Sequence, residues 1–322
     1  MNAIVVYGAT GHTGRFVVEE LRRQHLPVIV SGRNATTLAT QWPDLDVRPA
    51  AVDDPHALDT ALKEAEAVIN CAGPFAVTAE PLIDAAARRR IPYVDVAAEI
   101  EANVATFARR SDIPVAPAMA FFGGLGDLLA TATRQTRADL VQVAYGLSSW
   151  HPTPGTRVAG QISHDRRNGR RVRFADGRLQ YHADPTVQQD WQFPEPVGRR
   201  GVFAEFSMAD IVTIPSHLDV REVRTYMTLE AAGDLADADT PAPVAVDEQG
   251  RSDQTFVVDV RVGDVRASAT GQDIYAISAP LAVGAVRRIL GGRTRSAGIA
   301  SAGAMFDAVE FLEELPLSFE LR

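Results

Sequence analysis

The stretch that decides the fold lies near the N-terminus, where Ala3–Tyr7 reads AIVVY and Gly8–Gly14 follows as GATGHTG. The β-branched run predicts a buried strand, and the segment 15–24 predicts a helix. Glycines between a strand and a helix let the backbone approach a diphosphate, whose charge then lies on the helix N-terminus. The pattern indicates a variant of the Rossmann dinucleotide-binding turn, spaced G-x-x-G-x-x-G. The residues of this turn expected to bind a cofactor are Gly8, Ala9, Thr10, Gly11, His12, Thr13 and Gly14.

The end of the second predicted strand sets the cofactor preference. Residues 26–31 read as a buried parallel strand, which ends in Ser31, Gly32, Arg33 and Asn34. NAD-selective sites carry an acidic residue near this point for the ribose 2′-hydroxyl, whereas the first carboxylate here is Asp44. A guanidinium pairs well with a 2′-phosphate, so the sequence favours NADP(H) over NAD(H). In the alternative interpretation, Arg33 is solvated and Asn34 caps the next helix.

The first half of the chain alternates strands and helices, which predicts a doubly wound parallel sheet. The expected strands are 3–7, 26–31, 46–52, 67–71, 93–97 and 114–118, and the further helices are 55–65, 81–90 and 104–110. We predict a Rossmann domain over residues 1–121 and a second α/β domain over 122–322, built on a mixed or antiparallel sheet. A C-terminal helix that packs back on the Rossmann domain is compatible with this division.

In the second half of the chain the predicted helices and strands no longer alternate regularly. We expect helices over 124–136, 156–167, 274–290 and 303–315, and strands over 139–149, 220–231, 254–262 and 264–271. A hairpin is predicted over 171–181 with its turn at Asp176-Gly177, and another turn at Gly263-Asp264. Residues 234–250 are rich in Asp, Ala and Pro, which is typical of a mobile surface loop.

Ligands of doubly wound sheets bind beyond the carboxyl ends of the strands. Besides the two segments above, these ends carry Asp53, Asn70, Cys71, Ala72, Gly73, Pro74 and Phe75, all expected to contact the cofactor. Asp53 suits the adenine amine, with capping of the helix at Pro55 as the alternative. Glu99 follows the next strand in the same position.

Composition narrows the class of protein. The net charge of −9 argues against a general nucleic-acid binder. A single cysteine excludes an intrachain disulfide, and seven scattered histidines without HExxH spacing argue against a catalytic metal. The chain opens on a strand, with no signal peptide expected, and its longest apolar segment is interrupted by Arg287-Arg288. We therefore expect no membrane span and a cytoplasmic protein.

Three segments, Gly8–Gly14, Asn70–Phe75 (NCAGPF) and Tyr93–Glu99 (YVDVAAE), resemble the saccharopine dehydrogenase-like family, in its shorter branch that includes trans-acting enoyl reductases. The resemblance continues through Phe193–Arg199 and Asp273–Pro280 (DIYAISAP), so it covers most of the chain. It implies a Rossmann domain, a second domain that forms the substrate site, and NAD(P)-linked reduction of C=N or C=C bonds. The stretch 120–127 follows the family pattern only loosely, and Ala97-Ala98 replaces the usual Thr-Gly. The resemblance therefore does not identify the substrate of this protein.

Hydride transfer also needs a proton source. His151 is our candidate, because it lies beside Trp150 in a Pro/Gly loop of the second domain; a surface histidine is the alternative. Glu99 is the second candidate, to orient the cofactor amide or assist proton transfer, unless it only begins a helix. Further candidate donors are His164, Tyr145, Tyr181 and His217.

Three functions fit these residues. The first is an NADPH-dependent reductase of an activated C=C bond in a small or carrier-bound metabolite, with direct hydride transfer. The second is a C=N dehydrogenase of imine or amino-acid substrates, for which Arg157 is a candidate carboxylate clamp. The third is an NADP(H) sensor without turnover. We also expect a homodimer formed through the sheet of the second domain.

Overall fold

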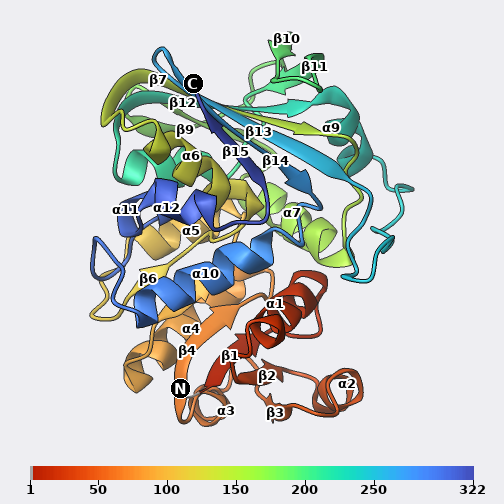
Figure 1. Cartoon of the computed structure of the whole chain (residues 1–322), viewed down its shortest axis with the longest axis vertical. Coiled ribbons are helices and arrows are strands. Elements are labelled where there is room, and N and C mark those ends of the chain that lie inside the picture. Colours follow the sequence, from red (N-terminus) through yellow and green to blue (C-terminus); the bar gives the residue numbers. More distant parts are fainter. Residues whose placement is uncertain (1–2) are drawn as a thin grey trace.

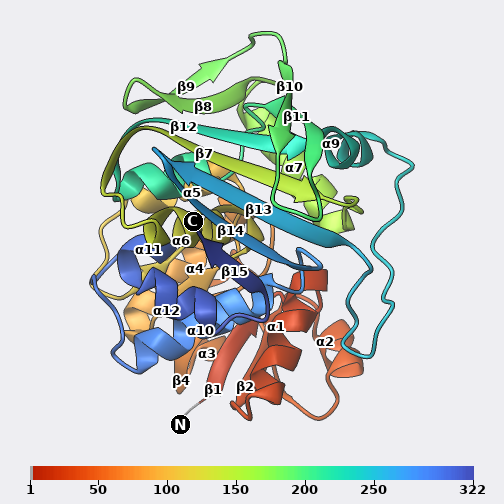
Figure 2. The same cartoon turned by 45° about the horizontal axis from the view of Figure 1, so that its top comes forward.

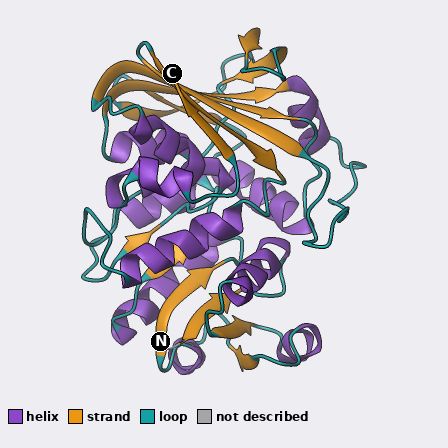
Figure 3. Ribbon diagram, viewed as in Figure 1, coloured by secondary structure: helices purple, strands orange, loops and turns teal. Residues whose placement is uncertain are grey.

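The computed structural model describes residues 3–322 and contains two sheets with helices layered between them (Figures 1 and 3). The lower half of Figure 1 is the N-terminal part of the chain. Its elements are β1 (Ala3–Tyr7), α1 (His12–Arg23), β2 (Val28–Gly32), α2 (Ala35–Gln41), β3 (Asp46–Pro49), α3 (Pro55–Ala61), β4 (Ala65–Asn70), α4 (Phe75–Arg89), β5 (Tyr93–Asp95), α5 (Ile100–Phe107) and β6 (Val115–Ala116).

The first sheet is parallel, with strand order β3-β2-β1-β4-β5-β6. This is the Rossmann order, so the predicted fold is confirmed. Alternate residues of β1 enter different cores: Ile4 and Val6 pack on the side of α1, and Val5 and Tyr7 on the side of α3 and α4. Both faces of the sheet are therefore covered, which explains why its strands read as continuous apolar runs.

The second half adds a nine-stranded mixed sheet, also as predicted. Its elements are α6 (Gly126–Ala132), β7 (Arg137–Leu147), α7 (Pro154–Arg166), β8 (Arg171–Ala175), β9 (Arg178–His182), β10 (Gln188–Gln192), β11 (Arg199–Ala204), α8 (Asp210–Thr213), β12 (Asp219–Thr228), α9 (Leu229–Ala236), β13 (Thr255–Val262), β14 (Val265–Gln272), α10 (Ser278–Leu290), α11 (Ala302–Met305), α12 (Ala308–Glu313) and β15 (Ser318–Leu321). The central strands β12 and β7 are parallel, and the other pairs are antiparallel. Figure 2 shows the β8–β9 hairpin projecting from the end of this sheet.

The C-terminal part of the chain returns to the first sheet. Helix α10 packs against α1 and also contacts β4 and β5, and in Figure 1 it lies between the two halves. Beyond it, Ile299 pairs in parallel with Val115 of β6, where the Val115 N–H donates to the Gly298 carbonyl and the Ala300 N–H donates to the Val115 carbonyl. The edge of the first sheet is thus completed by residues that follow the second sheet in sequence.

Several predicted boundaries were wrong, each for a local reason. Helix α4 begins at Phe75 and accommodates Pro81 in its interior, whereas the proline was expected to start the helix. The helix predicted over 303–315 is two short helices, because Asp307 caps α12. The strand predicted over 220–231 ends at Thr228, where α9 begins. Across residues 3–322, no helix is long and apolar enough to cross a membrane.

Candidate active site

The three glycines of the turn have different surroundings. Gly8 has φ +84°, and a Cβ there would lie 2.7 Å from the Ala72 backbone nitrogen. At Gly14 a Cβ would lie 2.2 Å from the Gly8 carbonyl oxygen. Gly11 differs, because its Cβ would meet only the Gly8 oxygen, at 3.3 Å. Gly8 and Gly14 are therefore required by the packing of the turn, while Gly11 presents an open backbone to a ligand.

Helix α1 differs from the next three helices at its N-terminus. Asn34 accepts a hydrogen bond from the Thr37 N–H at the start of α2, and Asp54 accepts one from the Ala57 N–H at the start of α3, both at 3.0 Å. The start of α4 is held by Glu99 from another element. Within the described residues no side chain caps α1. Its first N–H groups and its positive dipole end are left for an anion, which fits a cofactor diphosphate.

The residues after β2 and β3 divide into packing residues and exposed ones. The buried Ser31 hydroxyl donates to the Arg48 carbonyl at 2.7 Å, so its side chain is used inside the domain. Arg33 and Asp53 are exposed. Burial raises the pKa of Tyr7, with smaller opposing contributions from Arg33 and Asp53, so both charges lie near this phenol. Arg33 thus remains available for a 2′-phosphate, and the alternative for Asp53 is wrong, since Asp54 is the cap.

Helix capping by Glu99 shapes the loop after β4. Its carboxylate accepts from the Phe75 N–H at 2.9 Å and from the Ala76 N–H at 3.1 Å. Burial raises the pKa of Glu99, although the two N–H groups oppose this. Both carboxylate oxygens of Glu99 are therefore engaged. They hold the start of α4, and with it the end of the loop 70–75, in place.

The side chain of Asn70 is also used within the protein. Its amide nitrogen donates to Thr78 and to the Tyr93 hydroxyl, and its oxygen accepts from the Ala72 N–H at 3.0 Å. Burial raises the pKa of Cys71, so its thiol stays protonated. A cofactor at this loop would therefore meet mainly backbone groups, including those of Gly73 and Pro74.

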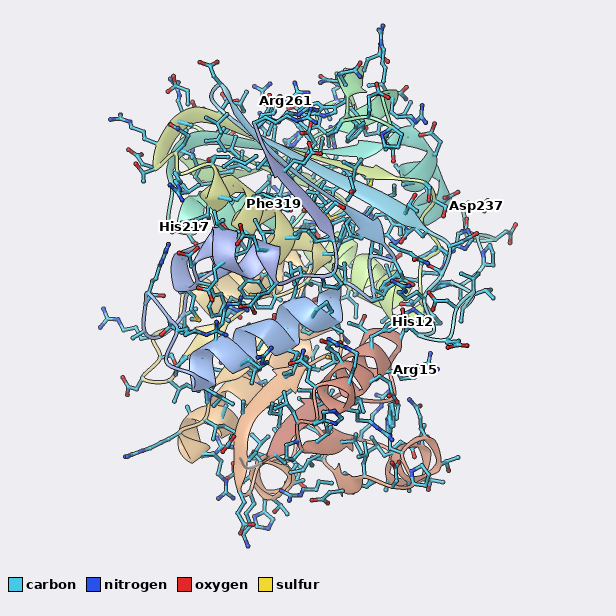
Figure 4. All side chains as sticks on the ribbon, in the orientation of Figure 1. His12, Arg15, His217, Asp237, Arg261 and Phe319 are labelled. Carbon is cyan, nitrogen blue, oxygen red and sulfur yellow. The ribbon has the colours of Figure 1, made fainter. Side chains whose placement is uncertain are left out.

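His151 is half-buried in the segment Ser148–Thr156, which we call the His151 segment. The Tyr275 hydroxyl holds this segment: it accepts from Trp150 Nε1 at 3.2 Å and from the Thr153 N–H at 3.3 Å, and donates to the His151 carbonyl at 3.3 Å. The ring of Tyr275 in turn lies 5.1 Å from that of His12, at the start of α1. His12 is labelled in Figure 4 at the tip of α1, next to the second domain. The structure thus brings the His151 segment to the glycine turn.

The other candidate proton donors lie in different settings. His217 bonds to buried Asp127 at 2.7 Å; burial lowers the pKa of His217, but this pair raises it overall. Buried Tyr145 donates to Asp210 at 2.8 Å. His164 and Tyr181 are exposed on α7 and β9. These contacts give His217 and Tyr145 structural roles.

Sequence reasoning missed two residues of the site, Tyr275 and Asp273. Asp273 is fully buried, and its carboxylate accepts from the N–H groups of Ser252, Tyr275 and Ala276. It therefore fixes the turn that presents Tyr275. Both residues belong to the DIYAISAP segment, whose resemblance to a family was the one available signal.

The fold and the uncapped glycine turn together define a Rossmann-type dinucleotide-binding domain joined to an α/β domain. Residues 4–119 match the model of the saccharopine dehydrogenase NADP-binding domain. The resemblance to the saccharopine dehydrogenase-like family is thus confirmed for the N-terminal domain, and the match supports NADP(H) as its cofactor, as predicted.

Curated relatives match the same part of the chain, and a solved structure matches its fold. A saccharopine dehydrogenase-like oxidoreductase of Bos taurus is 31% identical over 30% of this chain and 27% of its own length. A probable mitochondrial saccharopine dehydrogenase-like oxidoreductase of Arabidopsis thaliana is 31% identical over 30% and 26%, respectively. The match therefore spans about a quarter of these relatives. Apo saccharopine dehydrogenase (L-Glu forming) of Saccharomyces cerevisiae shares the fold over 100% of both chains, with TM-score 0.63 and 11% identity.

Proposed function

We propose that this protein is an NADPH-dependent reductase that acts on an activated C=C bond of a small or carrier-bound metabolite. The observation that carries the cofactor half of the proposal is the uncapped start of α1 at Gly11. Bound NADPH would supply a hydride. The backbone N–H groups of α1 would hold its diphosphate, Arg33 its 2′-phosphate, and Glu99 would keep the loop 70–75 in place through Phe75 and Ala76.

The preference for C=C reduction is supported by the side chains of the second domain. Arg157, the candidate clamp for a carboxylated imine, donates instead to the carbonyls of Asp237 and Thr240 at 3.0 and 2.9 Å. Next to His151, Trp150 packs on Phe122 with ring centroids 5.1 Å apart, and on Phe206. Aromatic surroundings favour an apolar unsaturated substrate over a charged one. His151 is our candidate for the proton donor.

A panel of enones, enoyl thioesters and cyclic imines, with NADPH oxidation followed at 340 nm, tests this function. We expect turnover with an alkene and deuterium on the product carbon when the cofactor carries it. Gly11→Val is the matched control, because loss of the cofactor should abolish turnover. Turnover with imines alone, lost in Arg157→Ala, would replace the proposal by C=N dehydrogenation. Tight NADPH binding without turnover across the panel would favour the sensor function.

We further propose a homodimer formed through the sheet of the second domain, in the cytoplasm. Helix α6 covers one face of this sheet through β13 and β14, and we place the dimer interface on the other face. Light scattering on the purified chain should give twice the monomer mass of 34.7 kDa. A monomer at micromolar concentration would contradict the dimer.

A further inference from the structure

The side chain of His12 links the glycine turn to the second domain. His12 is the first residue of α1, directly after Gly11, and its backbone belongs to the turn expected to hold the diphosphate. Its ring lies edge to face with that of Tyr275, at 5.1 Å and 85°, and with that of Phe16, at 5.3 Å and 83°. Such T-shaped pairs are favourable and directional. The contact with Tyr275 therefore joins two segments that are far apart in the sequence.

The imidazole is packed in its neutral form. Burial lowers the pKa of His12, while Asp273 raises it and Arg15 lowers it. Its Nε2 atom is buried and has no hydrogen-bond partner among the described residues. An unpartnered ring nitrogen is costly to bury, so this ring is not there for a bond of its own within the protein. Its aromatic contacts are what the structure shows it to provide.

Tyr275 connects His12 to the His151 segment. Its ring meets His12, while its hydroxyl contacts Trp150, His151 and Thr153 as described above, and also Thr156 Oγ1 at 3.0 Å. Burial raises the pKa of Tyr275, so the phenol keeps the proton that it donates. Asp273 holds the N–H groups of Tyr275 and Ala276, so the backbone of Tyr275 is fixed while its side chain connects His12 to the segment.

We propose that His12 is a positioning residue through which an occupied cofactor site holds the His151 segment in place, with Tyr275 as the intermediate contact. The inference rests on the proposed function, since it places NADPH at the glycine turn. A diphosphate on the first turn of α1 restrains the backbone of His12, and hence its ring. The restrained ring then limits the motion of the Tyr275 side chain. The hydroxyl of Tyr275 in turn limits the motion of the segment that carries His151.

Hydrogen exchange of the full-length protein, with and without saturating NADPH, tests this coupling. In the wild type we expect NADPH to slow exchange at residues 8–14 and, at least about tenfold, at residues 148–156. In His12→Ala the slowing at 8–14 should persist while that at 148–156 is lost. Tyr275→Phe keeps the ring but removes the hydroxyl, and should also lose the slowing at 148–156. His12→Phe should restore it, because the edge-to-face contact remains.

The control is His56→Ala, since His56 is an exposed histidine on α3 and its loss should leave both effects intact. Retention of the slowing at 148–156 in His12→Ala, or failure of His12→Phe to restore it, would overturn the inference. Absence of any slowing at 8–14 in the wild type would instead contradict the proposed cofactor site. The two failures are thus distinguishable. Equal slowing over the whole chain in every variant would also overturn the role of His12.

Discussion

The glycine turn and the His151 segment are connected through the contact between His12 and Tyr275, but they are built in opposite ways. The turn offers its backbone, and the neighbouring side chains of Ser31, Asn70 and Glu99 are engaged with other backbone groups of the domain, at Arg48, Ala72 and Phe75. The His151 segment is held by the side chain of Tyr275, which comes from a distant part of the chain. The glycine turn depends on where there is room for a Cβ atom, whereas the His151 segment depends on which side chain is present at position 275. Substitutions should therefore affect the two regions differently.

The largest effect is expected at Gly14, where the backbone of the turn leaves no room. In Gly14→Ala the Cβ would lie 2.2 Å from the Gly8 oxygen, so we expect a loss of about 3 kcal/mol in the free energy of unfolding. Urea unfolding measures this loss. Gly160→Ala in α7 is the matched control, because no atom lies within 4 Å of its Cβ, and it should be neutral or slightly stabilising. Equal stability of the two variants would remove the packing argument.

A substitution at Gly11 should weaken NADPH binding without a comparable loss in the free energy of unfolding. In Gly11→Val the new side chain faces the open side of the turn, so the Kd for NADPH should rise at least about 100-fold, or about 2.7 kcal/mol. The free energy of unfolding should change by less than about 1 kcal/mol. Calorimetric titration and urea unfolding together check this. Undiminished NADPH binding would refute the Rossmann site.

Arg33 is a side chain proposed to bind the cofactor at a site that is otherwise formed by backbone groups. Arg33→Ala removes the proposed partner of the 2′-phosphate, so the Kd for NADPH should rise about 10- to 100-fold, as for one charged hydrogen-bonding group. Binding of NADH should change by less than about threefold. Arg178→Ala, an exposed arginine of the second domain, serves as the control. If both cofactors weaken equally, Arg33 is not the residue that selects NADP(H).

The smallest effect concerns the side-chain network of the second domain. Burial raises the pKa of Asp210 from 3.8 to about 7. The folded protein therefore binds a proton that the unfolded chain releases between these values, and its contribution to stability falls as pH rises through this window. Asp210→Asn cannot ionise, so its Tm relative to wild type should increase by a few degrees from pH 5 to pH 8. A pH-independent difference, as expected for exposed Asp239→Asn, would contradict the raised pKa.

The same contrast explains what the sequence could predict. The glycine spacing, the alternation of elements and the missing acidic residue near Arg33 are local signals, and they gave the Rossmann domain and its cofactor. The strands β10, β11 and β15 were missed because they are short, with four to six residues each, and contain charged or polar residues. Tyr275 and Asp273 were missed because their partners lie more than a hundred residues away or depend on a buried turn. Contacts between distant side chains leave no periodic pattern in the sequence.

The return of the chain to the first sheet has a consequence for biosynthesis. The ribosome completes the strands β1–β6 early, yet the helix α10 that covers them and the residue Ile299 that pairs with β6 are made only after β7–β14. Domains generally fold as units in the order of synthesis. Part of the apolar surface of the nascent first domain must therefore stay uncovered until the second sheet has left the exit tunnel. The first domain thus completes its packing only together with the second.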